Sequence, residues 1–143
     1  MKNLLAIIIV AGTLVSCTDP KQAVVDELRT ETIELHDVVM PRMGELVDLG
    51  ADLKKLREGV VPDSADSTGA ARLVYTEQIA ALDEAYEVMM EWMADYEPLY
   101  DKDHPLDSAV VYYEGERSKI TKVKQAIEKS IEDAEKLKKE SGI

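Results

Sequence analysis

Cysteine is almost absent from this chain of 143 residues, in which Cys17 is the single example. An internal disulfide and a metal site built from several cysteines are therefore excluded. Phenylalanine is missing, and the aromatic side chains are one tryptophan and six tyrosines. A core must come mainly from Leu, Val, Ile, Met and Ala, and the unbranched members of that set favour helices.

Basic residues are also scarce: 17 lysines and arginines stand against 29 acidic residues, which gives a net charge of −12. An acidic surface of this size repels phosphate backbones and anionic lipid headgroups, so we expect no nucleic-acid partner. The sequence also lacks a nucleophile–base pattern, a glycine-rich phosphate loop and a metalloprotease motif. We therefore expect no enzymatic activity.

The one long apolar run lies at the start of the chain, between Lys2 and Cys17. A basic residue, an apolar run and small residues before a cleavage site are typical of a secretory signal peptide. The quartet LVSC at 14–17 resembles the lipobox of bacterial lipoproteins, in which a peptidase cuts before a cysteine that carries a diacylglyceryl group. The run is too short for a transmembrane helix, which needs roughly 20 apolar residues. We therefore expect a signal peptide at 1–16 and lipidation at Cys17, rather than plain secretion or a retained anchor.

The mature chain, 17–143, has the length of a single domain. Two or more acyl chains hold a protein stably on a membrane, so a lipidated Cys17 would be a sufficient anchor. We expect the protein to lie in the cell envelope, anchored to a membrane by its N-terminal lipid. It would face the periplasm or the cell exterior, with the outer membrane favoured.

Heptad spacing of apolar residues predicts three long helices, at about 20–59, 67–96 and 107–140. Short connections make neighbouring helices antiparallel. The expected fold is therefore all-α, an up-down-up antiparallel three-helix bundle with coiled-coil-like packing. The seam positions expected to form the core are Val25, Leu28, Thr32, Leu35, Val39, Leu46, Leu49, Leu53, Leu56 and Val60 in the first helix, Tyr75, Ile79, Leu82, Tyr86, Met89, Met93 and Tyr96 in the second, and Tyr113, Ile120, Val123, Ile127, Ala134 and Leu137, with Ile131 beside them, in the third.

The first helix has a clear start and one interruption. Asp19 followed by Pro20 suits a helix start, with an N-cap side chain and a proline in the first turn. Pro41 lies inside the helix, where proline removes a backbone donor and clashes with the preceding turn. We therefore expect a kink near 37–41.

The third helix has two competing starts. Asp107 or Ser108 can act as its N-cap, since both side chains accept a hydrogen bond from the first turn. Gly115 weakens the first turns by about 1 kcal/mol relative to Ala, so a later start is the alternative. The residues before it, 97–106, are expected to form the second connection.

The turn positions set the expected register between the helices. A turn centred near residues 62–63 places His36 opposite Met89. A similar turn between the second and third helices places Trp92 near 111–112. One layer of the bundle would then gather a histidine, several thioethers and aromatic rings.

This layer is the strongest candidate for chemistry, and its members are His36, Met40, Met43, Met89 and Met93. The first interpretation is that the methionines fill the core and pack on aromatic rings. The alternative is a Cu(I) site, because thioether and imidazole ligands suit that ion. A third interpretation is a His/Met axial pair for a non-covalent haem, for which three helices leave little room.

The acidic second connection invites a calcium site, and its spacing argues against one. An EF-hand loop that begins at Asp101 needs glycine at the position of Leu106 and an acidic residue at that of Tyr112. Neither is present, so we interpret the loop as solvated. His104 in this loop is expected to be a lone exposed histidine.

Two segments carry a family resemblance. HDVVMPRMGEL at 36–46 and AYEVMMEWMADYE at 85–97 resemble small Bacteroidota lipoproteins that often carry the label "viral A-type inclusion protein". Those sequences look like HDEVMPKMGEL followed by an AMMxWMxxF/Y element. Val38 stands here where an acidic residue is usual. The resemblance implies a lipid-anchored helical protein and no known activity.

Together these features predict a non-enzymatic, lipid-anchored helical bundle that acts as a structural or interaction module. Its partner would be an unknown protein or a second copy of the chain, since an apolar helical stripe can also pair with itself. No cofactor is expected unless the His/Met layer binds Cu(I). At roughly 1.5 Å per residue, that layer would lie about 25–40 Å from the lipid anchor.

Overall fold

The computed structural model describes residues 19–60 and 67–141. The expected signal peptide at 1–16, the lipidation site Cys17 and the turn expected near 62–63 lie outside the described residues. The described part is almost entirely helical and contains no strand. Its elements are α1 (Pro20–Val39), the 3₁₀ segment η1 (Met40–Arg42), α2 (Met43–Gly59), α3 (Ser67–Asp95), α4 (Tyr100–Asp103) and α5 (Leu106–Glu140).

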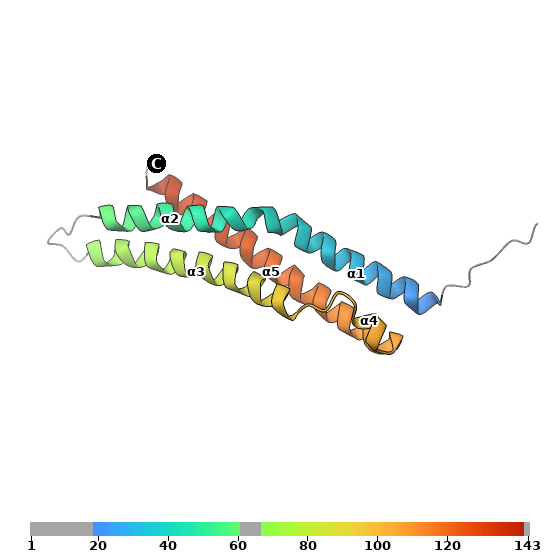
Figure 1. The fold of residues 1–143 in the computed structure, drawn as a ribbon. Helices are drawn as coiled ribbons and strands as arrows, with labels where there is room; N and C mark the ends of the chain where they lie inside the picture. Colours follow the sequence, from blue (N-terminus) through green and yellow to red (C-terminus); the bar gives the residue numbers. More distant parts are fainter. Residues whose placement is uncertain (1–18, 61–66, 142–143) are drawn as a thin grey trace, which may run out of the picture.

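The three long helical segments form an elongated bundle (Figure 1). α1, η1 and α2 make one bent rod, α3 returns beside α2, and α5 runs in the same direction as the first rod. The expected all-α, up-down-up three-helix bundle is therefore confirmed. The short helix α4 lies beyond the end of α3, toward the start of α1. None of the described helices is both long and apolar enough to cross a membrane.

The start of α1 follows its capping residues. Pro20 occupies the first turn, and the Asp19 carboxylate accepts a hydrogen bond of 2.8 Å from the Lys21 backbone N–H. Pro41 interrupts the rod, because the chain passes through a 3₁₀ turn at Met40–Arg42 before α2 begins. The expected kink is present, centred slightly later than predicted.

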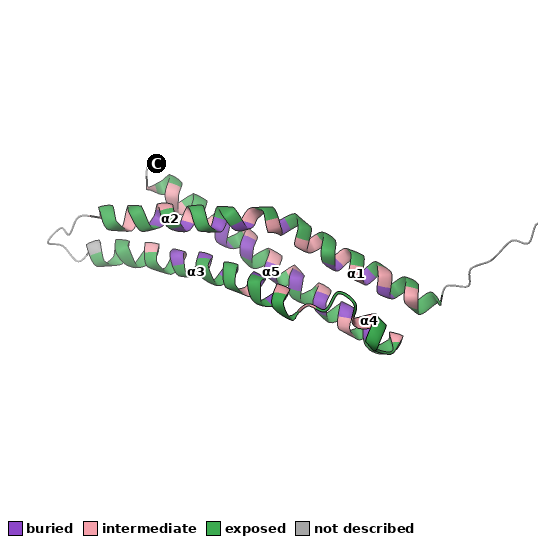
Figure 2. Cartoon of the chain, viewed as in Figure 1, coloured by how far each residue is buried: buried purple, intermediate pink, exposed green. Residues whose placement is uncertain are grey.

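The main core lies where α2, α3 and α5 meet (Figure 2). A smaller second cluster, where α1 packs on the start of α5, contains Val25, Leu28, Ala109 and Tyr113. Burying a large apolar side chain contributes roughly 1.5–3 kcal/mol, so both clusters stabilise the bundle. The largest side chains that are fully buried are Tyr113, Leu46, Leu53, Leu82, Met89, Ile120, Ile127 and Ile131.

One seam residue of α3 was predicted wrongly. Tyr86 was expected in the core, and it is 38% exposed. Ala85 and Trp92 are buried instead. The reason is that α3 packs against both α2 and α5. Its buried face is therefore the one that points between these two helices, and Tyr86 lies outside that face.

Three ion pairs fix the register between the first rod and α5. Lys21–Asp107, Glu31–Arg117 and Asp52–Lys138 each join residues that are 86 positions apart, with N–O distances of 2.5 Å. A constant offset is what two parallel helices of equal rise produce, and it holds on both sides of Pro41. Surface ion pairs of this kind each add little to the free energy of unfolding, so here they mainly show how α5 is aligned with the first rod.

The start of α5 and the second connection also differ from expectation. α5 begins at Leu106 with Pro105 as its N-cap residue, so neither Asp107 nor Ser108 has that position. Gly115 does not delay the helix, because buried Ala109 and Tyr113 anchor the turns before it. The connection is not a plain loop, since it contains α4.

Candidate functional site

The five residues of the His/Met layer lie around the junction of α1, η1, α2 and α3. Met43 and Met89 are buried in the main core, with exposed fractions of 7% and 0%. Met40 and Met93 are half-buried and pack against the same core. His36 lies at the edge of the layer, with its side chain 22% exposed. The structure thus separates two core methionines from three residues nearer the surface.

His36 faces Trp92 rather than Met89, so the predicted register was wrong by about one turn. The two ring centroids are 5.8 Å apart, and the His36 Nδ1 atom lies 2.9 Å from an Asp37 carboxylate oxygen. The shift is already present between α2 and α3, where the Arg72 side chain donates a hydrogen bond to the Arg57 carbonyl oxygen. The first rod also keeps one offset to α5 on both sides of Pro41, so the 3₁₀ turn does not produce the shift.

The register between α3 and α5 also differs from the prediction. Trp92 does not lie near 111–112, because it shares a hollow with Glu116, Lys119 and Val123. Residues 96–103 continue past the end of α3 before α5 turns back (Figure 1). That extension places a later part of α5 beside Trp92.

A row of aromatic rings runs from this layer to the second connection. Its neighbouring ring centroids are 4.9 Å apart for Trp92 and Tyr96, 6.5 Å for Tyr96 and Tyr112, and 4.1 Å for Tyr112 and Tyr100. Tyr100 in turn stacks on His104 at 3.8 Å. We call the row His36, Trp92, Tyr96, Tyr112, Tyr100 and His104 the aromatic column.

The aromatic column fixes the second connection on the bundle. Each aromatic pair contributes roughly 0.5–1.5 kcal/mol beyond the burial of its area. His104 is exposed as expected, and it is not a lone residue, because its Nδ1 atom also lies 3.0 Å from the Tyr100 carbonyl oxygen. The sequence held one signal for the column, since Trp92/Tyr96 and Tyr100/His104 are each spaced four apart, and each pair spans the end of a helix.

Asp101 is the centre of a polar network that joins α4 to α1 and α5. Its side chain is 2% exposed, and its Oδ1 atom accepts hydrogen bonds from Arg29 at 2.9 Å and from the Tyr113 hydroxyl at 3.1 Å. Burial alone would raise the pKa of Asp101, but the Tyr113 hydrogen bond and the Arg29 charge outweigh it and lower that pKa. The carboxylate that was considered as the start of a calcium loop is therefore part of an internal ion pair.

Three polar atoms beside the aromatic column have no hydrogen-bond partner within the described part of the chain. They are Trp92 Nε1, the Tyr96 hydroxyl and Glu116 Oε2. The other Glu116 oxygen accepts a hydrogen bond from Lys119 at 2.7 Å. Burial, together with the nearby tyrosines Tyr112 and Tyr113, raises the pKa of Tyr96 far above its ordinary value. This buried layer therefore favours a neutral Tyr96.

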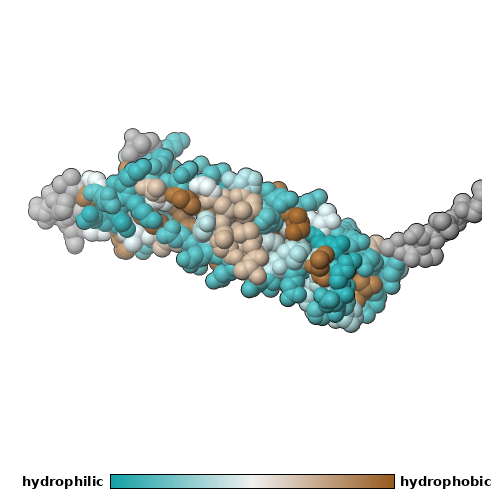
Figure 3. Space-filling view, in the orientation of Figure 1, coloured by the Kyte–Doolittle hydropathy of each residue, from teal (hydrophilic) through white to brown (hydrophobic). Residues whose placement is uncertain are grey.

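The surface between α2 and α3 carries a groove of about 300 Å³ that is lined by both apolar and acidic side chains. We call it the α2–α3 groove, and its lining residues are Leu46, Val47, Leu82, Asp83, Tyr86 and Glu87. Val47 is 58% exposed, and Met90, one helical turn after Tyr86, is 45% exposed. The space-filling view shows an apolar area across the middle of this face with hydrophilic residues around it (Figure 3).

Binding of a metal ion by the described residues would need side chains grouped closely around it. No group of three or more His, Asp or Glu side chains in this part of the chain is placed to hold a metal ion. Methionine thioethers are a different ligand class, so the Cu(I) hypothesis for His36, Met40, Met43, Met89 and Met93 stays a prediction.

No protein-family model, no curated protein and no solved structure matches the chain. The resemblance of 36–46 and 85–97 to small Bacteroidota lipoproteins therefore stays an expectation from the sequence. The function has to be argued from the residues themselves.

Proposed function

We propose that the protein is a lipid-anchored, non-enzymatic helical bundle of the cell envelope, which acts as a structural or interaction module. The lipid would be attached at Cys17 after removal of 1–16, and the outer membrane is the favoured location. The proposal is supported by the LVSC quartet at 14–17 and by the place where the first helix begins.

The start of α1 is the observation that carries the proposal. Asp19 caps the helix and Pro20 opens it, so only two residues separate Cys17 from the start of the rod. A lipid on Cys17 would therefore sit at one end of the bundle, beside α4 and the start of α5. At roughly 1.5 Å per residue, the far end of α2 would lie about 60 Å from that anchor. Such a rod suits the display of a surface at a distance from the bilayer.

The anchor is tested by replacing Cys17 with alanine in the full chain and fractionating the cells. The wild-type protein should be found with the membranes and should incorporate radiolabelled palmitate, whereas the Cys17→Ala variant should do neither. A matched Ser16→Ala variant keeps the cysteine and should behave as the wild type. Membrane association and palmitate labelling that survive Cys17→Ala would refute the proposal.

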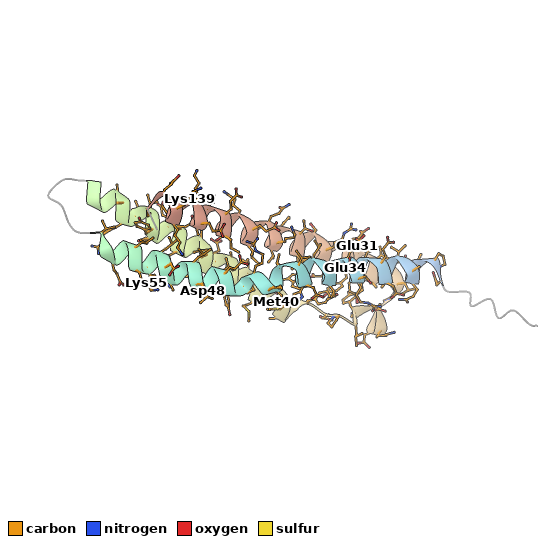
Figure 4. All side chains as sticks on the ribbon, turned by 90° about the horizontal axis from the view of Figure 1, so that it is seen from above. Glu31, Glu34, Met40, Asp48, Lys55 and Lys139 are labelled. Atoms are coloured by element: carbon orange, nitrogen blue, oxygen red, sulfur yellow. The ribbon has the colours of Figure 1, made fainter. Side chains whose placement is uncertain are left out.

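A second candidate function is Cu(I) binding, and the solvent access of three residues favours it. His36, Met40 and Met93 are all partly accessible to solvent near one junction of the bundle. Met40 projects from the side of the first rod that faces away from Glu31 and Glu34 (Figure 4). These three residues are the members of the predicted set that an ion could reach from outside.

A further inference from the structure

We propose that the α2–α3 groove is a docking surface for a basic amphipathic helix of a partner protein. This inference rests on the proposed role as an interaction module and names the surface that would carry it. An amphipathic helix binds such a groove by inserting apolar residues spaced three and four apart. The groove lies between two helices of the bundle, in the geometry that a third helical face can fill.

The apolar part of the surface is formed by side chains that the bundle leaves exposed. Val47 and Tyr86 line the groove from opposite sides, with exposed fractions of 58% and 38%. Met90 extends the stripe by one turn along α3 and is 45% exposed. Flexible methionine and tyrosine side chains are suited to a binding surface, because methionine adapts its shape and tyrosine buries a large area.

The charge around the groove selects the partner. Between Leu73 and Asp95, α3 contains no lysine or arginine. Within the described part of the chain, none of the α3 carboxylates forms an ion pair with a lysine or arginine. The carboxylates of this helix are Glu77, Asp83, Glu84, Glu87, Glu91 and Asp95.

The two sides of α3 differ in how this charge is balanced. On the side of α5, Glu91 and Asp95 share a hollow with Lys119 and Lys122. On the side of α2, Asp83 and Glu87 line the groove with no basic residue among its lining. The groove thus combines an apolar floor with an acidic rim. A helix with lysine or arginine beside its apolar face complements both features.

The same charges argue against a second copy of the chain as the occupant. In a symmetric dimer built on this groove, Asp83 and Glu87 of each copy would face the acidic rim of the other. Like charges across an interface cost free energy, and no basic residue of the lining would offset them. The basic helix is therefore the occupant that the surface favours.

The proposal is tested with a synthetic peptide of about five helical turns, in which leucines spaced three and four apart form one face and lysines the other. Its affinity for the full protein, purified in detergent, is measured by fluorescence anisotropy. The Tyr86→Ala/Met90→Ala variant should weaken binding at least about tenfold. The control Val111→Ala changes a more exposed apolar side chain, on α5, and should leave the affinity unchanged.

A second pair of variants separates docking from a folding defect and from general charge attraction. Asp83→Asn/Glu87→Gln alters only exposed side chains and should weaken binding about three- to tenfold. Glu132→Gln/Glu140→Gln removes the same charge from α5 and should have no effect. Equal losses in both pairs, or equal binding of a peptide with glutamate in place of lysine, would overturn the proposal. So would a dimer of the wild-type protein that Tyr86→Ala dissociates.

Cross-linking in cells distinguishes this proposal from the function on which it rests. A photoreactive residue is placed at Met90 in one strain and at Val111 in another. Cross-linking from Met90 to a segment with a basic, amphipathic helical sequence supports the docking surface. Cross-linking to a partner from Val111 alone overturns the surface and leaves the interaction role standing. A protein that cross-links from neither position counts against both.

Discussion

Arg29 and Asp101 form an ion pair between α1 and the short helix α4, with 2.9 Å between Nη1 and Oδ1. The Asp101 side chain is 2% exposed and that of Arg29 is 28% exposed. Tyr113 of α5 donates a second hydrogen bond to the same carboxylate oxygen. One carboxylate therefore holds three parts of the chain together at the end of the bundle where the lipid would lie.

Removing the charge of Asp101 is predicted to destabilise the bundle. Asp101→Asn should lower the free energy of unfolding by about 2 kcal/mol, because it removes the buried one of the two carboxylates that pair with Arg29 and leaves only the more exposed Asp26. Urea unfolding followed by circular dichroism measures the effect. Asp107→Asn is the matched control, since Asp107 pairs with Lys21 on the exposed surface, and it should cost close to nothing. Equal losses in the two variants would contradict this account of the network.

The same carboxylate predicts how stability changes with pH. The pKa of Asp101 is lowered in the folded state, because the Tyr113 hydrogen bond and the Arg29 charge outweigh the effect of burial. A lowered pKa contributes stability above the unfolded value, and that contribution is lost as the pH falls through the folded value. The wild type should therefore lose more stability than Asp101→Asn between about pH 5 and pH 3. Parallel losses in both proteins would show that other carboxylates dominate acid unfolding.

This network also shows where prediction from sequence stops. The heptads predicted the helices and most core residues, because burial of a seam depends on local spacing. The pairing of Arg29 with Asp101 depends on residues 96–103 continuing past α3, which no local pattern indicates. The register between α2 and α3 depends likewise on the connection between them, and it brings His36 to Trp92 rather than to Met89. The connections between the helices thus decide which side chains of a candidate site meet.

Replacing Tyr96 is predicted to preserve or raise the stability of the bundle, in contrast to replacing Asp101. Its hydroxyl is buried without a hydrogen-bond partner in the described part of the chain, and such a group costs free energy on folding. Tyr96→Phe keeps the ring that stacks on Trp92 at 4.9 Å and removes the hydroxyl. We expect the variant to be as stable as the wild type or more stable by about 1 kcal/mol. Thermal unfolding followed by Trp92 fluorescence measures it, and a clear loss of stability would mean that the hydroxyl is bonded in solution.

The dependence of stability on pH above neutrality provides a second measurement on Tyr96→Phe. Burial raises the pKa of Tyr96 in the folded state, so the stability that depends on its neutral form is complete below about pH 10 and is lost at higher pH. The wild type should therefore lose more stability than Tyr96→Phe above about pH 10. Tyr86→Phe is the control, because Tyr86 is 38% exposed, and it should follow the wild type.

Cu(I) binding is the last prediction, and the burial of the five residues shapes its test. If the His/Met layer binds the ion, the accessible residues His36, Met40 and Met93 should provide the ligands, because Met43 and Met89 are buried in the apolar core. The double variant His36→Ala/Met40→Leu should then lose affinity by at least about tenfold in a competition titration against a Cu(I) chelator.

The control for that titration is Met90→Leu, an exposed methionine outside the predicted set, which should bind Cu(I) as the wild type does. Leucine replaces methionine with little change in volume, so neither the Met40 nor the Met90 substitution should disturb the packing. If the wild type, the double variant and the control all bind Cu(I) equally weakly, the methionines serve the core alone. A loss shared by the control and the double variant would instead indicate diffuse binding by exposed thioethers, because a defined site depends on particular residues.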